Sequence, residues 1–318
     1  MKYYFTLQYR MLNRHLKEFG LPPIIGYVLA LIFFAGVSVF LFYKTEYAAY
    51  IYPFFAVSSL SLLSETKRND FLKTCFINKD YWRVRLIENL LMALPFVLFL
   101  AYQQQWLIGL GLVIMAGLMA RFHFNNQLNY TIPTPFYKYP FEFTVGFRTS
   151  ISMFLFAYFL TVMSISVSNF NLGVFALLLI FLTSFSFYAL PDSQFYVWIF
   201  SSTSNTFLLD KLKIALFYIT LLALPILLSL GYYFSEKVKL LLVFQGLGYI
   251  YLCTIILAKY AAFPRAMNLP ETIFIIASVF FPPFLLFTIP FFYKKAISKL
   301  SPVLSANSMA PQSQFTNH

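Results

Sequence analysis

The 318-residue sequence has little charge, little cysteine and little glycine. Only 11% of its residues are charged and 60% are hydrophobic, whereas soluble domains are about 25% charged and about 45–50% apolar. A water-soluble globular fold is therefore excluded. Cys75 and Cys253 stand alone in the sequence, which argues against a disulfide framework or a zinc site. The eleven glycines form no GxxxG motif, so helix packing through that motif is excluded too.

Sequence patterns of common enzyme classes are also missing. The chain contains no GxxxxGK[ST] phosphate-binding loop, no HExxH zinc motif and no GxSxG nucleophile motif. It has no pair of aspartate-rich motifs that would hold magnesium. We therefore expect no ATPase or other catalytic site, no metal site and no cofactor in this chain.

Long apolar runs fill most of the chain, which has a mean hydropathy of +0.73. A membrane helix needs roughly 20 apolar residues. Nine runs predict an all-α polytopic membrane protein: 23–43, 47–63, 87–102, 106–120, 150–168, 172–190, 214–234, 240–258 and 272–293. Among Asp, Glu, Lys, Arg and His, only Glu88 falls inside them, and this scarcity argues against a proton-driven antiporter.

The connections between these runs alternate between tight and long. The long ones carry most of the basic residues: 64–86, 121–149, 191–213 and 259–271. Because basic loops stay in the cytoplasm, we expect the long connections and the N-terminus on that side. The formal charge of +12 is spread over many loops, so nucleic acid is not an expected partner.

The C-terminal part of the chain permits two topologies. The pair Pro282-Pro283 divides the last run, which favours a re-entrant hairpin that returns the following lysines to the cytoplasm. A kinked full crossing is the alternative. We expect a transmembrane domain over 23–293 and a polar, disordered cytoplasmic tail over 294–318.

Residues 1–22 precede the first run and have a helical apolar pattern. One face is expected to carry Phe5, Tyr9, Leu12, Leu16 and Phe19, and the opposite face Arg10, Arg14 and Lys17. Such a helix lies in the membrane interface, with its basic face toward anionic headgroups, so membrane lipids are an expected partner. The alternative is a short basic end that frays.

Residues 64–91 mix basic, acidic and apolar side chains. We expect a short helix there, capped by Asn69 or Asp70, which projects from the membrane and docks into a groove on a soluble partner. The alternative is a solvated positive-inside loop. The docking element is assigned to Asp70, Phe71, Leu72, Lys73, Phe76, Tyr81, Arg83, Arg85 and Glu88.

Two further long connections are rich in aromatic residues. In 121–148, Phe136, Phe141 and Phe143 stand among prolines and tyrosines, a composition typical of the headgroup belt. The connection 191–213 predicts another surface helix around Trp198.

In its layout, the chain resembles the permease subunit of a bacterial ATP-binding-cassette exporter whose ATPase is a separate polypeptide. Three stretches carry the resemblance: MKYYFTLQYRMLNRHLKEFG, SETKRNDFLKTCFINKDYWRVRLIEN and PTPFYKYPFEFTVGFR. In such permeases, the first is an interfacial helix and the second holds the coupling helix that sits in a cleft of the ATPase. Many of these permeases have six spans rather than nine, so the resemblance does not identify pore-lining residues.

The resemblance implies an export permease in the bacterial cytoplasmic (inner) membrane. ATP and magnesium would bind to a cytoplasmic cassette ATPase, and closure of its dimer would move the spans through the coupling helix. Phe71, Leu72 and Phe76 would sit in the ATPase cleft. Two copies of the chain, or one copy and a different permease, would form the pathway.

Two other classes stay open. A secondary transporter, channel or lipid-handling protein would be favoured by a gene neighbourhood without a cassette ATPase. A scaffold or assembly factor of a membrane complex would be favoured by co-purification with a partner that is not an ATPase.

Overall fold

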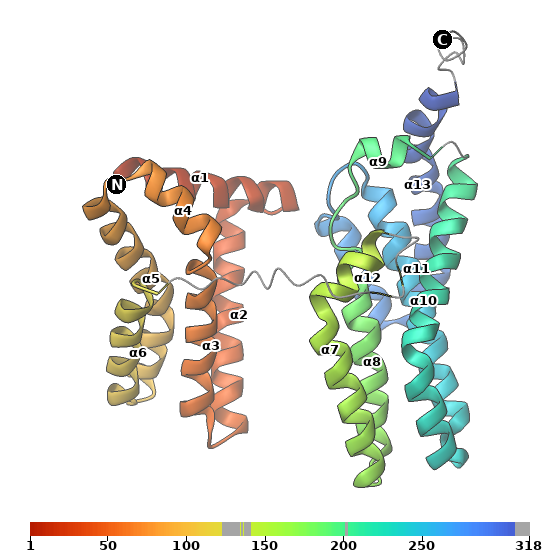
Figure 1. Cartoon of the computed structure of the whole chain (residues 1–318), viewed down its shortest axis with the longest axis horizontal. Helices are drawn as coiled ribbons and strands as arrows, with labels where there is room; N and C mark the ends of the chain where they lie inside the picture. Colours follow the sequence, from red (N-terminus) through yellow and green to blue (C-terminus); the bar gives the residue numbers. More distant parts are fainter. Residues whose placement is uncertain (123–133, 135, 137–140, 201–202, 309–318) are drawn as a thin grey trace. The chain divides into compact units, whose positions relative to one another are not determined.

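The computed structural model describes residues 1–122, 134, 136, 141–200 and 203–308, apart from the side chains of residues 141 and 305–308. Within these residues the chain is helical and contains no β-strand (Figure 1). It divides into two compact units, Met1–Tyr130 and Thr131–His318. The all-α class expected from the apolar runs is confirmed.

The first unit consists of two helical hairpins with two further helices at one end. Its helices are α1 (Lys2–Phe19), α2 (Pro23–Lys44), α3 (Ala48–Leu63), α4 (Thr66–Cys75), α5 (Asn78–Tyr102) and α6 (Trp106–Met119). The pairs α2–α3 and α5–α6 run antiparallel, α1 lies crosswise to α2, and α4 lies at the same end as α1 (Figure 1).

The corner between α1 and α2 follows from a few residues. Gly20 adopts the left-handed conformation with φ 97°, which glycine adopts without steric cost. The N–H of Gly20 donates to the Lys17 carbonyl at 3.0 Å and that of Leu21 to the Leu16 carbonyl at 2.9 Å, and these two bonds end the helix in a Schellman motif. Pro23 then begins α2. The helix expected over the N-terminal segment is therefore confirmed.

The second unit packs two longer hairpins against a C-terminal helix. Its elements are α7 (Phe141–Ser166), α8 (Phe170–Ser186), α9 (Gln194–Trp198), α10 (Ser204–Tyr233), η1 (Ser235–Lys237), α11 (Val238–Ala262), α12 (Leu269–Phe280), η2 (Pro282–Phe284) and α13 (Leu285–Ser308). The core is formed by apolar side chains of α7, α8, α10, α11 and α13. The surface helix expected around Trp198 is present as α9.

The chain reverses direction at Pro282-Pro283, between α12 and α13. The Phe274 and Phe291 rings stack with their centroids 5.3 Å apart, and Lys295 Nζ lies 2.7 Å from a Glu271 carboxylate oxygen. Contacts between residues at equal or nearly equal distances on either side of the proline pair require a hairpin. The reversal that a re-entrant segment needs is thus present, and a single kinked helix through this run is wrong.

The helix α13 extends through part of the expected tail. It continues to Ser308, so the expected disorder does not hold for 294–308, and residues 309–318 lie outside the described part. Ala296, Leu300 and Leu304 recur every four residues and are buried. This apolar stripe stabilises the helix against the core although the segment is polar on average.

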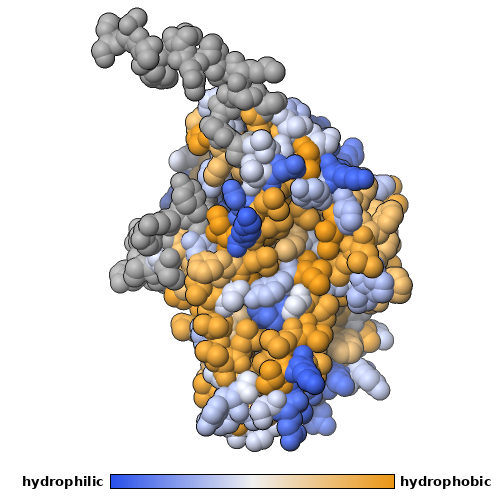
Figure 2. Space-filling model, turned by 90° about the vertical axis from the view of Figure 1, so that its right-hand side faces the viewer, coloured by the Kyte–Doolittle hydropathy of each residue, from blue (hydrophilic) through white to orange (hydrophobic). Residues whose placement is uncertain are grey.

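Five described helices have the length and composition to cross a membrane: α2, α5, α7 from Glu142, α10, and α11 together with η1. The apolar helices α3, α6, α8 and α12 are shorter. A multi-pass membrane protein is therefore supported, but the expected count of nine membrane segments is not confirmed. The face viewed in Figure 2 fits this reading, because apolar side chains cover most of its middle and hydrophilic ones gather toward its two ends.

The aromatic connection before α7 differs from expectation. Phe136 and Phe143 are buried in the core of the second unit rather than placed in a headgroup belt. Their rings lie against each other and against Tyr218. The prolines and tyrosines expected beside them, within 123–133, 135 and 137–140, lie outside the described residues.

Candidate functional site

The helix α4 is a short element between two apolar helices, as the sequence predicts for residues 64–91. One face is buried, with Asn69 0% and Leu72 3% exposed, whereas Phe71 is 66% exposed. The helix begins at Thr66 without a side-chain cap, so the expectation that Asn69 or Asp70 caps it is wrong. The result is a helix fixed on one side that presents an aromatic ring on the other.

A polar cluster ties α4 to α1 and α5. Arg68 of α4 forms an ion pair with Glu88 of α5, and the Tyr4 hydroxyl of α1 donates to the same carboxylate. Burial and this hydrogen bond raise the pKa of Tyr4 to about 12. The consecutive helices α4 and α5 and the distant helix α1 are thus joined at one carboxylate.

A second anchor lies beneath α4. The Arg85 side chain is fully buried and donates to the Leu63 carbonyl, to Ser64 Oγ at 3.1 Å and to the Met119 carbonyl at 3.4 Å. One turn along α5, Asn89 Nδ2 donates to the Ala116 carbonyl at 3.1 Å. These bonds join the end of α3, which leads directly into α4, to α5 and α6.

The other residues of the predicted docking element have mixed positions. Leu72 and Tyr81 are buried within the first unit, and the Phe76 ring packs edge-on against Tyr4 at 5.6 Å. Of the three apolar residues expected in an ATPase cleft, Phe71 alone therefore projects outward. Two exposed ion pairs lie within single helices, Lys73 with Asp70 on α4 at 3.6 Å and Arg83 with Asp80 on α5 at 3.8 Å.

The predicted interfacial residues lie along α1. Phe5 and Leu16 are partly covered by protein, while Tyr9, Leu12 and Phe19 are 59%, 50% and 39% exposed. Such an open apolar stripe suits contact with lipid. The basic residues Arg10, Arg14 and Lys17 are exposed, and Arg14 forms an i,i+4 ion pair with Glu18 at 2.7 Å.

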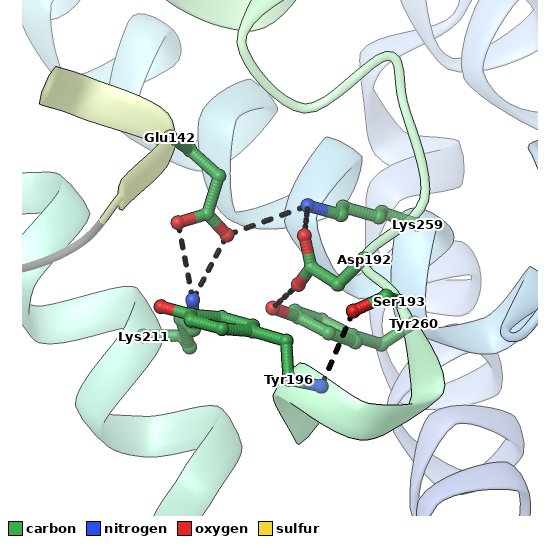
Figure 3. Close-up of polar contacts among 7 residues, drawn as sticks. All are labelled: Glu142, Asp192, Ser193, Tyr196, Lys211, Lys259 and Tyr260. Atoms are coloured by element: carbon green, nitrogen blue, oxygen red, sulfur yellow. Dashed lines mark hydrogen bonds and ion pairs between the residues drawn. The ribbon is translucent and has the colours of Figure 1, made fainter. Parts of the chain in front are cut away.

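The second unit contains a buried charge cluster that the sequence reading missed. It consists of Glu142, Asp192, Lys211 and Lys259, whose side chains are 10% exposed or less (Figure 3). Lys211 Nζ lies 2.9 and 3.1 Å from the two Glu142 carboxylate oxygens. Lys259 Nζ lies 2.6 Å from Asp192 Oδ1 and 3.4 Å from Glu142 Oε1. The four groups thus form one connected network.

Four separate segments bring these groups together. Glu142 lies in the first turn of α7, Lys211 near the start of α10 and Lys259 in the last turn of α11. Asp192 lies in the connection between α8 and α9, where Ser193 caps α9 by accepting from the Tyr196 N–H at 3.2 Å. The network therefore fixes one end of three helices and the start of α9.

Aromatic rings surround both ammonium groups. Lys211 Nζ lies 5.0 Å from the Tyr196 ring centroid, and Lys259 Nζ lies 5.4 and 5.5 Å from the Tyr188 and Tyr260 centroids. The Tyr260 hydroxyl donates to Asp192 Oδ2 at 2.7 Å. Ring faces attract cations and so complement the carboxylates.

A cavity of about 510 Å³ opens beside this network. Glu142, Asp192 and Lys259 contribute to its wall, together with hydroxyl groups and apolar side chains of α7 and of the connection after α8. Its size is within the roughly 300–1,000 Å³ typical of small-molecule sites. The arrangement has the features of a ligand site in which one part of the wall carries paired charges and the rest is largely apolar.

The charge network was not predicted from the sequence because its members lie outside the apolar runs, beyond their ends. The helix α7 begins at Phe141 rather than 150, α10 at Ser204 rather than 214, and α11 ends at Ala262 rather than 258. Each extension carries one of the buried charges into a segment that was interpreted as a loop. Lys211 and Lys259 lie within one helical turn of an apolar run, and this proximity was the available signal for them, whereas Glu142 lies eight residues before its run.

Within the described residues, no group of three or more His, Cys, Asp or Glu side chains is arranged to hold a metal ion. The groups that the network and its cavity offer to a ligand are paired charges, hydroxyl groups and aromatic rings. Comparisons with protein-family models, with curated proteins and with solved structures find no match to this chain.

Proposed function

We propose that the protein is the membrane-spanning permease subunit of an ATP-binding-cassette exporter, driven by an ATPase on a separate chain. It would be a multi-pass protein of the bacterial cytoplasmic membrane with its N-terminus in the cytoplasm. Nine membrane segments, of which eight cross and the last is re-entrant, would leave α1, α4 and the C-terminal helix on the cytoplasmic side. ATP and magnesium would be bound by the partner.

The observation that carries this proposal is the mounting of α4. A helix that transmits movement from a soluble ATPase to membrane helices must be exposed on one side and firmly attached on the other. The helix α4 meets both requirements, because Phe71 projects outward while Arg68, through Glu88, holds α4 to α5 and to Tyr4 of α1. Arg85 fixes the end of α3 beneath it. Movement of α4 would therefore be passed directly to α3, α5 and α6.

The exposed apolar stripe and exposed basic residues of α1 support the same orientation. The Tyr4 hydroxyl connects α1 to the α4 anchor, so the open apolar stripe of α1 would hold the coupling element at membrane level. Two copies of this chain, or one copy and a different permease, would form the pathway above an ATPase dimer.

The test is a mild-detergent purification of the tagged protein from its native host, with partners identified by mass spectrometry. A stoichiometric cassette ATPase is expected. Phe71→Asp should lose the ATPase while the protein still inserts in the membrane. Tyr47→Asp is the matched control, because Tyr47 is an exposed aromatic residue (70%) in the tight α2–α3 connection. Reproducible absence of an ATPase from the wild-type complex would contradict the proposal.

A secondary transporter is the second candidate, and one observation favours it. Ionisable residues buried within membrane segments mark ion and substrate pathways. The buried Glu142, Lys211 and Lys259 belong to three of the helices that are long and apolar enough to cross a membrane. Solute uptake that follows an ion gradient in vesicles containing the purified chain alone would establish this class instead.

A further inference from the structure

The cavity beside the charge network lies wholly within the second unit, between α7, the connection after α8, the start of α9 and the end of α11. Its wall has two chemically different parts. One part presents Glu142, Asp192 and Lys259, and the other presents Val145, Phe187 and Leu190. A complementary ligand therefore needs both charged and apolar groups.

The charge balance of the wall restricts the charge of that ligand. In the network described above, two carboxylates are matched by two ammonium groups, with Lys211 bonded to Glu142. A ligand with a net charge would leave one charge unbalanced in a poorly solvated site, which is costly. A ligand with one positive and one negative group can bind a carboxylate and an ammonium group of the network at the same time. The total charge of the site then stays at zero.

The hydrogen-bonding capacity of the network fits such an exchange. An ammonium group has three donors, and Lys259 has one short bond, to Asp192 at 2.6 Å, and one long contact, to Glu142 at 3.4 Å. Lys259 can therefore donate to an anionic group in the cavity. A carboxylate offers about four acceptor sites, so Asp192, which accepts from Lys259 and Tyr260, can still accept from a ligand ammonium.

The apolar part of the wall is held in place by a close contact. The Phe187 ring packs directly on Gly146, where an added Cβ would come within 2.3 Å of the ring. A Cβ at this position would clash with the ring, and the ring also packs edge-on against Phe143 at 5.4 Å and Phe154 at 6.3 Å, so it presents a flat apolar surface at the cavity wall. It can cover a hydrocarbon group of the ligand.

We infer that this cavity binds a zwitterion with an apolar substituent, its anionic group on Lys259 and its ammonium group on Asp192 and Glu142. A free hydrophobic dipeptide and the headgroup region of a zwitterionic phospholipid share this chemistry. The inference names the solute class of the proposed transporter and rests on that function. Binding is measured on the isolated chain, so a missing ATPase partner and a wrong ligand class are distinguishable.

The first experiment varies the charge of one probe. Leucyl-phenylalanine, its methyl ester and its N-acetyl derivative are titrated calorimetrically into the purified full chain in non-ionic detergent. The zwitterion should bind about tenfold or more tightly than the cationic ester or the anionic derivative, because each loses one charged contact. Equal affinities for the three forms, or no binding of the zwitterion, would overturn the inference.

The second experiment tests the residues without leaving a buried charge unpaired. Asp192→Asn/Lys259→Met removes one positive and one negative group and should weaken binding of the zwitterion about tenfold or more. Lys213→Met, at an exposed position of α10, is the control and should bind as the wild type does. Unchanged affinity in the folded double variant would also overturn the inference.

A lipid arm identifies the source of the zwitterion. The dipeptide titration is repeated in nanodiscs of phosphatidylethanolamine and of phosphatidylglycerol. Weaker dipeptide binding in the zwitterionic lipid would show that a lipid headgroup occupies the cavity, and equal binding would show that the site takes a free solute.

Discussion

The two units of the chain share an order of elements but use their charged residues differently. Each has a hairpin, then a short helix, then a second hairpin, with α4 and α9 as the short helices. In the first unit the buried Arg85 donates mainly to backbone carbonyls. In the second unit Glu142, Asp192 and the two lysines bind one another beside a cavity.

This difference suits the two units to different roles. An arginine held by carbonyl groups at the ends of α3 and α6 has no charged partner to exchange and serves as a fixed support for α4. Mutually paired charges on a cavity wall are exchangeable, because a ligand of suitable charge can replace one partner with another. The first unit is thus suited to transmit movement, and the second to bind a solute.

The largest effect should come from removing one charge of the paired network. Lys259→Met leaves Asp192 without its ammonium partner and should lower the free energy of unfolding by about 3–5 kcal/mol. Unfolding by SDS in mixed micelles measures this change. The balanced variant Asp192→Asn/Lys259→Met should lose only about 1 kcal/mol, since no charge remains unpaired. Equal losses in both variants would show that the pairing does not determine stability.

Removing the fixed support should have a smaller but more local effect. Arg85→Met removes three hydrogen bonds from a charged donor, at a cost of about 1.5–3 kcal/mol. The Leu63 carbonyl still accepts from Arg68 Nη1 and the Met119 carbonyl from the Phe122 N–H, so no buried acceptor is left unpaired there. Hydrogen exchange of α4 should become faster, with no change in the second unit. Arg83→Met, at an exposed position of α5, should change neither the free energy of unfolding nor the hydrogen exchange of α4. Faster exchange throughout the chain would contradict a local role for Arg85.

The sequence predicted the architecture better than the sites. Apolar runs located the five helices that are long and apolar enough to cross a membrane, and the mixed composition of 64–91 predicted α4. Sequence could not show which way α4 faces, so Leu72 and Phe76 were assigned to docking although they pack inward. It also could not show that Glu142, Lys211 and Lys259 converge, because long-range pairing depends on how the helices pack.

The smallest effect on stability is expected at the surface of α4. Phe71→Asp should change the free energy of unfolding by less than about 0.5 kcal/mol, because Phe71 is largely exposed. The same SDS titration measures it. A loss as large as that of Arg85→Met would mean that Phe71 belongs to the support rather than to a docking surface.

The most direct test of the coupling role is photo-crosslinking from position 71. The photoreactive residue p-benzoylphenylalanine replaces Phe71 in one variant and Tyr47 in another, and both are irradiated in native membranes. Docking of α4 predicts a crosslink to a cassette ATPase from position 71 and none from position 47. An intact complex in which position 71 gives no crosslink to the ATPase would contradict the assignment of α4 as the coupling element.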